Sequence, residues 1–159
     1  MKTFKKLVKI LTEKEKTIAT MESCTGGAVV NAITCIEGAS DVLKFSAVTY
    51  SNHYKIKMGV DRNIIDKYTV YSIETAKEMA KVIAHFANAN YGVGITGKLN
   101  RVDKNNPFGE DNVVFVSIYV RDKNEWVNAT VEATKSSRKQ NKDLVIKKVI
   151  ELLENEVGD

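Results

Sequence analysis

The sequence has little of the residues that build cross-linked, collagen-like or linker structures. Its 159 residues include 2 cysteines, 1 proline and 9 glycines. Such a low cysteine count excludes the disulfide framework of a small secreted domain, and the scarcity of proline and glycine excludes collagen-like and linker-like chains. With 43% hydrophobic residues, the chain can bury the core of a single globular domain.

Long apolar runs and metal-binding motifs are missing as well. No apolar stretch approaches the roughly 20 residues that cross a bilayer, and the first residues form a charged amphipathic pattern rather than a signal-peptide core. We therefore expect a cytoplasmic protein with free thiols at Cys24 and Cys35. These cysteines are too far apart for a paired zinc-ligand motif, and His53 and His85 do not complement them, so we expect no metal.

Charge is balanced rather than one-sided. Lys and Arg number 24 and Asp and Glu number 20, which gives a net charge of +4. Basic residues are interspersed with acidic residues over residues 5–16 and 142–156, a mixture that is typical of solvated helix faces. The small excess suits an anionic small molecule, but there is no continuous basic stripe, so we expect neither nucleic acid nor a membrane as a partner.

Hydrophobic periodicity predicts strands that alternate with helices. The predicted helices cover residues 4–16, 28–36, 72–87 and 144–153, and the predicted strands cover residues 17–21, 45–50, 91–97, 113–120 and 126–131. Alternation of this kind predicts a three-layer α/β/α sandwich, and the late strand pair with its short connection makes the sheet mixed. The polar residues 98–112 predict a long surface loop.

One strand-to-helix turn contains residues that could carry chemistry. Ser23, Thr25, Gly26 and Gly27 lie where a predicted strand gives way to a helix, and there backbone N–H groups and the helix dipole can hold an anion. Ser23 could act as a nucleophile if a lysine with a lowered pKa takes its proton. The plainer interpretation is a helix cap formed by Ser23 and Thr25, and the pattern alone does not favour a nucleophile over this cap.

Three segments together resemble a known family. Residues 22–27 (ESCTGG), 50–55 (YSNHYK) and 94–97 (GITG) are similar to motifs of the C-terminal domain family of the competence/damage-inducible protein CinA. The enzymatic members of that family are nicotinamide-nucleotide amidases. The resemblance covers nearly the whole chain and implies one such domain over residues 1–159, without the N-terminal partner domain of the family.

The resemblance also implies a reaction and roles for single residues. The reaction is hydrolysis of the carboxamide of nicotinamide mononucleotide to nicotinate mononucleotide and ammonia, without a metal or other cofactor, by a cytoplasmic homo-oligomer. Ser23 matches the nucleophile, Lys55 the general base, and Thr96 a residue that binds or polarises the substrate. Further contacts to the substrate are implied for Tyr50, for the oxyanion-binding residues Thr25, Gly26 and Gly27, and for Arg138 at the start of the last helix.

Residues 98–112 depart from the pattern of the family. The resemblance implies a glycine- and proline-rich loop after Gly97, but residues 98–106 contain neither glycine nor proline. N–H groups that approach a phosphate closely rely on glycine, although the lysines and Arg101 could supply charge instead. The alternative hypothesis is therefore a catalytically silent member that binds a pyridine nucleotide or a protein partner through residues 98–112.

Other candidate residues have plainer explanations. Cys24 beside Ser23 could be reactive at a helix N-terminus, but a small packing residue is the simpler interpretation. We expect His53 to lie in an exposed loop and His85 to be a partly exposed structural residue. Trp126 is not interleaved with basic residues, so the sequence does not indicate a base-stacking platform.

Overall fold

The computed structural model describes residues 3–100 and 110–158 of the chain. Its elements, in chain order, are α1 (Lys5–Glu13), β1 (Ile18–Glu22), α2 (Ala28–Thr34), η1 (Ala39–Asp41), β2 (Ala47–Val48), α3 (Asn52–Lys57), α4 (Arg62–Tyr68), α5 (Ile73–Phe86), β3 (Tyr91–Gly97), β4 (Val113–Val120), η2 (Arg121–Lys123), β5 (Glu125–Glu132) and α6 (Arg138–Val157). Most of the predicted loop over residues 98–112 lies outside the described residues.

A mixed five-stranded sheet forms the centre of the molecule, as predicted. Its strands lie in the order β2-β1-β3-β4-β5. The first three are parallel to one another, whereas β4 runs antiparallel to both β3 and β5. Glu22 at the end of β1 pairs with Val48 of β2 and with Ile95 of β3, so the three parallel strands end at the same edge of the sheet.

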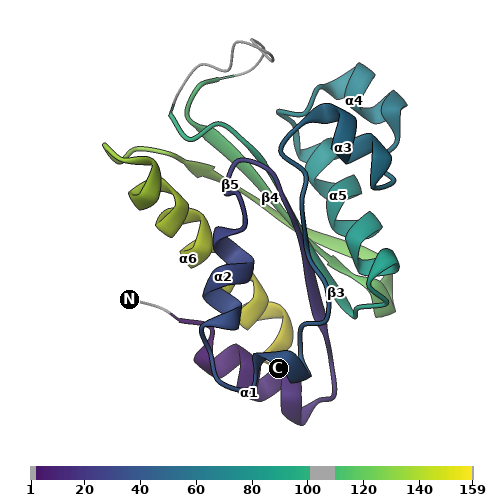
Figure 1. Cartoon of the computed structure of the whole chain (residues 1–159), viewed down its shortest axis with the longest axis vertical. Coiled ribbons are helices and arrows are strands. Elements are labelled where there is room, and N and C mark those ends of the chain that lie inside the picture. The colour runs from purple at the N-terminus through teal and green to yellow at the C-terminus, as the bar shows by residue number, and fades with distance from the viewer. Residues whose placement is uncertain (1–2, 101–109, 159) are drawn as a thin grey trace.

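Helices cover both faces of this sheet and confirm the predicted three-layer sandwich. Figure 1 shows α1, α2 and α6 on one face and α3, α4 and α5 on the other. A hydrophobic core lies on each face of the sheet. Alternate residues of β1 pack in one core or the other, because successive side chains of a strand point to opposite faces. Ile18 packs in the core beneath α1, α2 and α6, whereas Ala19 and Met21 pack in the core beneath α4 and α5.

Helix α5 lies unusually close to β3 because two glycines face it. A methyl group on Gly94 would lie 2.1 Å from the carbonyl oxygen of Ala76, and one on Gly92 would lie 2.0 Å from that of Ala80. The helix begins where the sequence predicts, since the Ser72 hydroxyl accepts a hydrogen bond from Thr75 N at 3.2 Å. This packing brings the segment before α5 to the end of β3.

The segment over residues 45–68, which precedes α5, differs from the sequence prediction. The predicted strand over residues 45–50 contains only the two residues of β2, and two short helices, α3 and α4, follow it. Ser51 caps α3 and Asp61 caps α4 through their side chains. Helices of six and seven residues are too short to show an apolar periodicity, which is why the sequence did not indicate them.

The first helix also ends earlier than predicted, at Glu13 rather than near Lys16. The later strand pair matches closely, because β4 covers residues 113–120 and β5 covers residues 125–132. None of the helices in the described part of the chain is long and apolar enough to span a bilayer.

Candidate active site

The three motif segments meet at the edge of the sheet where the parallel strands end. Ser23 directly follows β1, and its N–H donates to the Ile95 carbonyl of β3 at 3.0 Å. Thr49 directly follows β2, and its N–H donates to the Glu22 carbonyl at 2.8 Å. The carboxyl ends of parallel strands are the usual position of ligand sites in α/β proteins, so this edge is the candidate site.

Ser23 and Lys55 form a buried pair at this edge. The Nζ of Lys55 donates to Ser23 Oγ at 2.9 Å and to the Thr49 carbonyl oxygen at 2.8 Å. Lys55 is 1% exposed and Ser23 is 7% exposed. The structure therefore brings the two residues that the resemblance singled out, 32 positions apart in the chain, into direct hydrogen-bond contact.

The turn that carries Ser23 is held by the buried carboxylate of Glu22. This side chain is 0% exposed and accepts four hydrogen bonds, from Thr20 Oγ1 at 3.1 Å, Thr25 Oγ1 at 2.7 Å, and the backbone N–H groups of Val29 and Val30, both at 2.9 Å. Glu22 thus accepts hydrogen bonds from free N–H groups in the first turn of α2. The sequence suggested Ser23 and Thr25 for this capping role. This role of Glu22 was not predicted from the sequence, although the residue opens the ESCTGG motif.

Two glycines shape the remainder of this turn, which we call the nucleophile loop (residues 23–27). Gly26 and Gly27 have φ values of 61° and 98°, in the left-handed region that glycine adopts without strain. Gly26 N donates to the Ser23 carbonyl. Within residues 3–100 and 110–158, the N–H groups of Thr25 and Gly27 have no hydrogen-bond partner, so they are the loop donors open to a ligand.

Other residues implied by the resemblance lie around the pair in different ways. The Thr96 side chain is 1% exposed, and its hydroxyl donates to the Val70 carbonyl at 2.6 Å, which ties β3 to the segment before α5. Tyr50 is 65% exposed and precedes the Ser51 cap of α3. Thr49 Oγ1 is buried without a hydrogen-bond partner in the described part of the chain, so a polar ligand could satisfy it.

Cys24 is a buried thiol beside the nucleophile. Burial raises the pKa of Cys24 to about 12, although the positive charges of Lys55 and Arg138 oppose this rise. The thiol therefore stays protonated at neutral pH, in agreement with the expected packing role.

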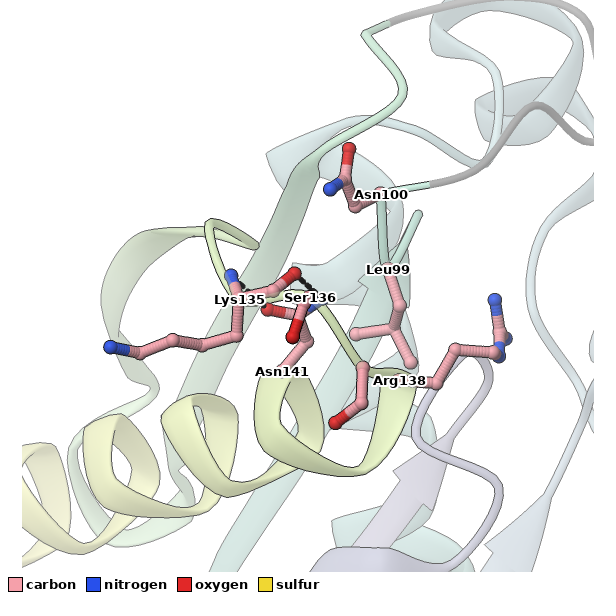
Figure 2. Close-up of a pocket in the computed structure, with 7 residues that line it drawn as sticks. Leu99, Asn100, Lys135, Ser136, Arg138 and Asn141 are labelled. Carbon is pink, nitrogen blue, oxygen red and sulfur yellow. Dashed lines mark hydrogen bonds between the residues drawn. The ribbon is translucent and has the colours of Figure 1, made fainter.

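Arg138 opens α6 and lines a pocket at the start of this helix. The pocket has a volume of about 220 Å³ and is lined by Leu99, Asn100, Lys135, Ser136, Ser137, Arg138 and Asn141. Figure 2 shows Arg138 and Lys135 on opposite sides of it. The buried Asn141 side chain fixes one wall, because it accepts from Lys135 N at 2.9 Å and donates to the Lys135 carbonyl at 3.3 Å.

Comparison with known families agrees with this arrangement. The family model described as "CinA C-terminal domain" matches residues 1–157. The chain belongs to the CinA C-terminal domain family. This confirms the resemblance seen in the three motif segments.

Individual relatives extend the comparison. A CinA-like protein of Flavobacterium psychrophilum is 37% identical over 115 residues, which are 70% of this chain and 27% of that protein. More generally, the chain spans 22% to 28% of the length of the curated relatives that it matches.

Solved structures of the CinA superfamily share the fold. The competence/damage inducible protein CihA of Agrobacterium tumefaciens aligns with a TM-score of 0.81 and 26% identity, over 93% of this chain and 89% of that chain. A CinA superfamily protein of Klebsiella pneumoniae aligns with a TM-score of 0.87 and 16% identity, over 97% of this chain and 94% of that chain.

The segment in which this CinA-family domain departs from the motif pattern begins inside the protein. Lys98 and Leu99 are each 3% exposed, which corrects the prediction of a surface loop at this end. The Lys98 ammonium lies 3.6 Å from Asp111 Oδ1 and 4.6 Å from the centre of the Tyr71 ring. Leu99 packs in the core beneath α6, because it lies on the opposite face of the chain from Lys98.

The remaining candidates occupy peripheral positions. Both cysteines are free thiols, with Cys35 exposed, as expected. His53 lies in α3 rather than in a loop, with its ring 5.1 Å from that of Tyr54. His85 is exposed near the end of α5, and in the described residues no group of three His, Cys, Asp or Glu side chains could hold a metal ion.

Proposed function

We propose that this CinA-family domain is a serine amidase that hydrolyses the carboxamide of nicotinamide mononucleotide, with Ser23 as nucleophile and Lys55 as general base. The observation that carries the proposal is the 2.9 Å hydrogen bond between these two buried side chains. A serine hydroxyl becomes a useful nucleophile when a base within hydrogen-bond reach removes its proton. The names of the relatives speak only of competence, damage and CinA, so the reaction itself is the proposal.

The surroundings of Lys55 support its role as a base. Burial favours the neutral form of an amine, and Lys55 is 1% exposed. The Thr49 carbonyl accepts one Nζ hydrogen and so orients the nitrogen toward Ser23. A neutral Nζ in this position can accept the Ser23 proton.

The reaction then follows as acyl transfer. Ser23 Oγ attacks the amide carbon, and the N–H groups of Thr25 and Gly27 donate to the oxyanion that forms. The Lys55 ammonium returns its proton to the departing nitrogen, which leaves as ammonia. Lys55 next takes a proton from water, which attacks the acyl carbon. The bond from this carbon to Ser23 Oγ breaks, Lys55 returns the proton to Oγ, and nicotinate mononucleotide is released.

The other implied residues complete the proposal. Thr96 keeps the end of β3 in place through its bond to Val70, and the exposed Tyr50 ring borders the site. Gly26 and Gly27 give the nucleophile loop its shape, and Arg138 offers positive charge to the nucleotide. A cytoplasmic homo-oligomer that acts on a small nucleotide belongs to the same proposal.

Ammonia release from nicotinamide mononucleotide, without added metal, tests this function. We expect Ser23→Ala and Lys55→Met to lower turnover by at least about 100-fold, because each removes one half of the proton-transfer pair. Ser40→Ala, which changes an exposed serine, serves as the matched control and should keep the wild-type rate. Wild-type turnover in Ser23→Ala would contradict the proposal.

A second candidate is favoured by the pocket beside Leu99 and Asn100. A catalytically silent member could bind a pyridine nucleotide or a protein partner there, using the described end of the segment over residues 98–112. Binding of nicotinamide mononucleotide to the wild type without any ammonia release would support this alternative over the amidase.

A further inference from the structure

We propose that Lys142 of α6 is a substrate-binding residue that, together with Arg138, holds a phosphate-like anionic group at the edge of the nucleophile loop. This inference rests on the proposed function, because it names the part of the substrate that the loop surface would bind. The mixed charges of residues 142–156 predict that Lys142 lies on a solvated helix face. The structure places Lys142 against the loop.

The position of Lys142 is shown by its closeness to Gly26. A methyl group added to Gly26 would lie 3.6 Å from Lys142 Nζ, so the ammonium lies directly over the middle of the nucleophile loop. Lys142 follows Arg138 by four residues, and such residues share one face of a helix. Both cations of α6 are therefore directed to the same side, toward the loop and α2.

These two cations lack the ion pairs that other lysines of α6 form. Lys139 pairs with Asp143 at 3.9 Å and Lys148 pairs with Glu151 at 3.4 Å. Among the described residues, neither Arg138 nor Lys142 has a carboxylate within ion-pair distance. Their positive charge at the loop is thus left for a ligand.

The acid nearest in sequence to the loop does not neutralise this charge. Glu22 is fully buried and its two oxygens already accept four hydrogen bonds from Thr20, Thr25 and the start of α2. The positive charges of Arg138 and Lys142 are therefore left without an ion-pair partner in the part of the chain that the structure describes. Phosphate matches these two cations, because it accepts several hydrogen bonds and carries negative charge.

Open space adjoins Arg138. Arg138 lines the pocket of about 220 Å³ at the start of α6, which Figure 2 shows open between the helix and Asn100. An arginine binds phosphate through two parallel N–H groups, whereas a lysine acts as a point charge. Gly26 presents no side chain that would shield the Lys142 ammonium from a ligand on the loop.

The kinetic test compares substrates with and without a phosphate. For Lys142→Met, we expect the KM for nicotinamide mononucleotide to rise by about 10-fold, the size of one charge-assisted hydrogen bond, with kcat unchanged. The KM for nicotinamide riboside, which lacks the phosphate, should not change. Lys139→Met is the matched control, because Lys139 lies on the same turn of α6 with a side chain that is 91% exposed, and it should behave as the wild type.

A binding test separates this inference from the amidase proposal. Titration with inorganic phosphate and with nicotinamide mononucleotide, followed by calorimetry, needs no turnover. Weaker binding of both by Lys142→Met, in a protein that releases no ammonia, would overturn the amidase and keep the anion site. Equal binding and equal KM in Lys142→Met and the wild type would overturn the anion site, whatever the activity.

Discussion

Glu22 is the residue on which the geometry of the nucleophile loop depends most. Its carboxylate has no solvent contact and accepts from two hydroxyl and two backbone N–H donors. An ionised acceptor strengthens each of these bonds relative to a neutral one. Removal of the charge would leave part of this buried donor set unsatisfied, and that is costly inside a protein.

We therefore expect Glu22→Gln to lower the free energy of unfolding by on the order of 2 kcal/mol, measured by urea denaturation. The amide offers one acceptor oxygen where the carboxylate has two, and its NH₂ group would face other donors. Glu37→Gln, at an exposed position, is the control and should leave the urea midpoint unchanged. An unchanged midpoint in Glu22→Gln would show that the four hydrogen bonds contribute little.

At the same scale, the sequence identified Ser23 and Lys55 but neither Glu22 nor Lys142. The first two belong to motifs that a reader can match by residue type and spacing. The roles of the other two depend on the tertiary structure, since Lys142 lies close to Gly26 only because α6 packs against α2. No local pattern distinguishes Lys142 from the solvated lysines of the same helix.

Among the elements, the packing of α5 against β3 sets the position of Thr96 and of the segment before α5. Gly92 and Gly94 let the helix backbone approach the strand, and Thr96 then reaches the Val70 carbonyl before α5. Larger residues at the two glycines would collide with main-chain atoms, which cannot rotate away as a side chain can.

Gly94→Ala should therefore destabilise the protein by at least about 1–3 kcal/mol, the usual cost of overpacking, as judged by thermal unfolding. Gly38→Ala is a useful comparison, because nothing lies within 4 Å of the added methyl although φ is +88°. It reports the backbone strain of alanine alone, about 1–2 kcal/mol. A smaller loss in Gly94→Ala than in Gly38→Ala would contradict the steric explanation.

Element prediction failed where elements are short. Helix α3 has six residues, yet it carries Lys55 into the site, and the sequence showed only a polar stretch there. Its start depends on the Ser51 cap, a local signal shared with many turns. Helix α5 and the paired strands β4 and β5 were predicted well because their periodicities extend over several turns or alternations, whereas α6 extends beyond the predicted residues 144–153 at both ends.

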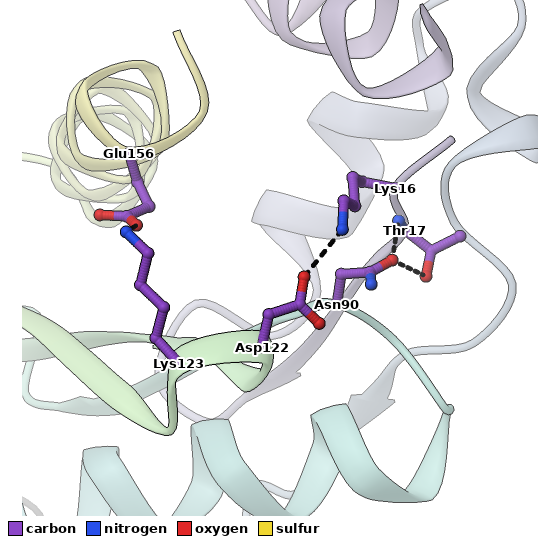
Figure 3. Close-up of polar contacts among 6 residues, drawn as sticks. All are labelled: Lys16, Thr17, Asn90, Asp122, Lys123 and Glu156. Atoms are coloured by element: carbon purple, nitrogen blue, oxygen red, sulfur yellow. Dashed lines mark hydrogen bonds and ion pairs between the residues drawn. The ribbon is translucent and has the colours of Figure 1, made fainter. Parts of the chain in front are cut away.

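On the scale of the whole molecule, ion pairs join distant elements at the end of the sheet away from the site. Lys16, before β1, pairs with Asp122 of η2 at 2.8 Å, and Lys123 pairs with Glu156 of α6 at 3.3 Å. Figure 3 shows both pairs beside the contact of Thr17 with Asn90. These contacts close the amino-terminal ends of β1 and β3 against the turn between β4 and β5.

The Lys16–Asp122 pair should make stability depend on pH. The hydrogen bond from Lys16 lowers the pKa of Asp122 below its ordinary 3.8, although desolvation opposes this. Because the folded protein favours the carboxylate, the contribution is present above the ordinary pKa and is lost as the pH falls through the lower folded value. The Lys16 side chain is 34% exposed and the Asp122 side chain is 56% exposed, so solvent screens the pair.

We expect Asp122→Asn to lower the free energy of unfolding by less than about 1 kcal/mol at neutral pH, and we expect the difference from the wild type to shrink as the pH falls below 3.8. Urea denaturation across this pH range measures both quantities. Asp66→Asn, at an exposed position without a described ion pair, is the control. A difference that grows toward acid would contradict the assigned pairing.

The sequence by itself determined the α/β class, the mixed sheet, the longer elements and the family, because periodicity and motif spacing are local properties of the chain. Tertiary structure decided which of the marked residues meet. Strand order brings Ser23 beside the Lys55 of α3, and helix packing brings Lys142 over Gly26. The same packing buries Lys98 and Leu99 in a segment whose polarity predicts exposure. Such contacts arise from long-range packing, in which each side chain's environment is set by residues far away along the chain.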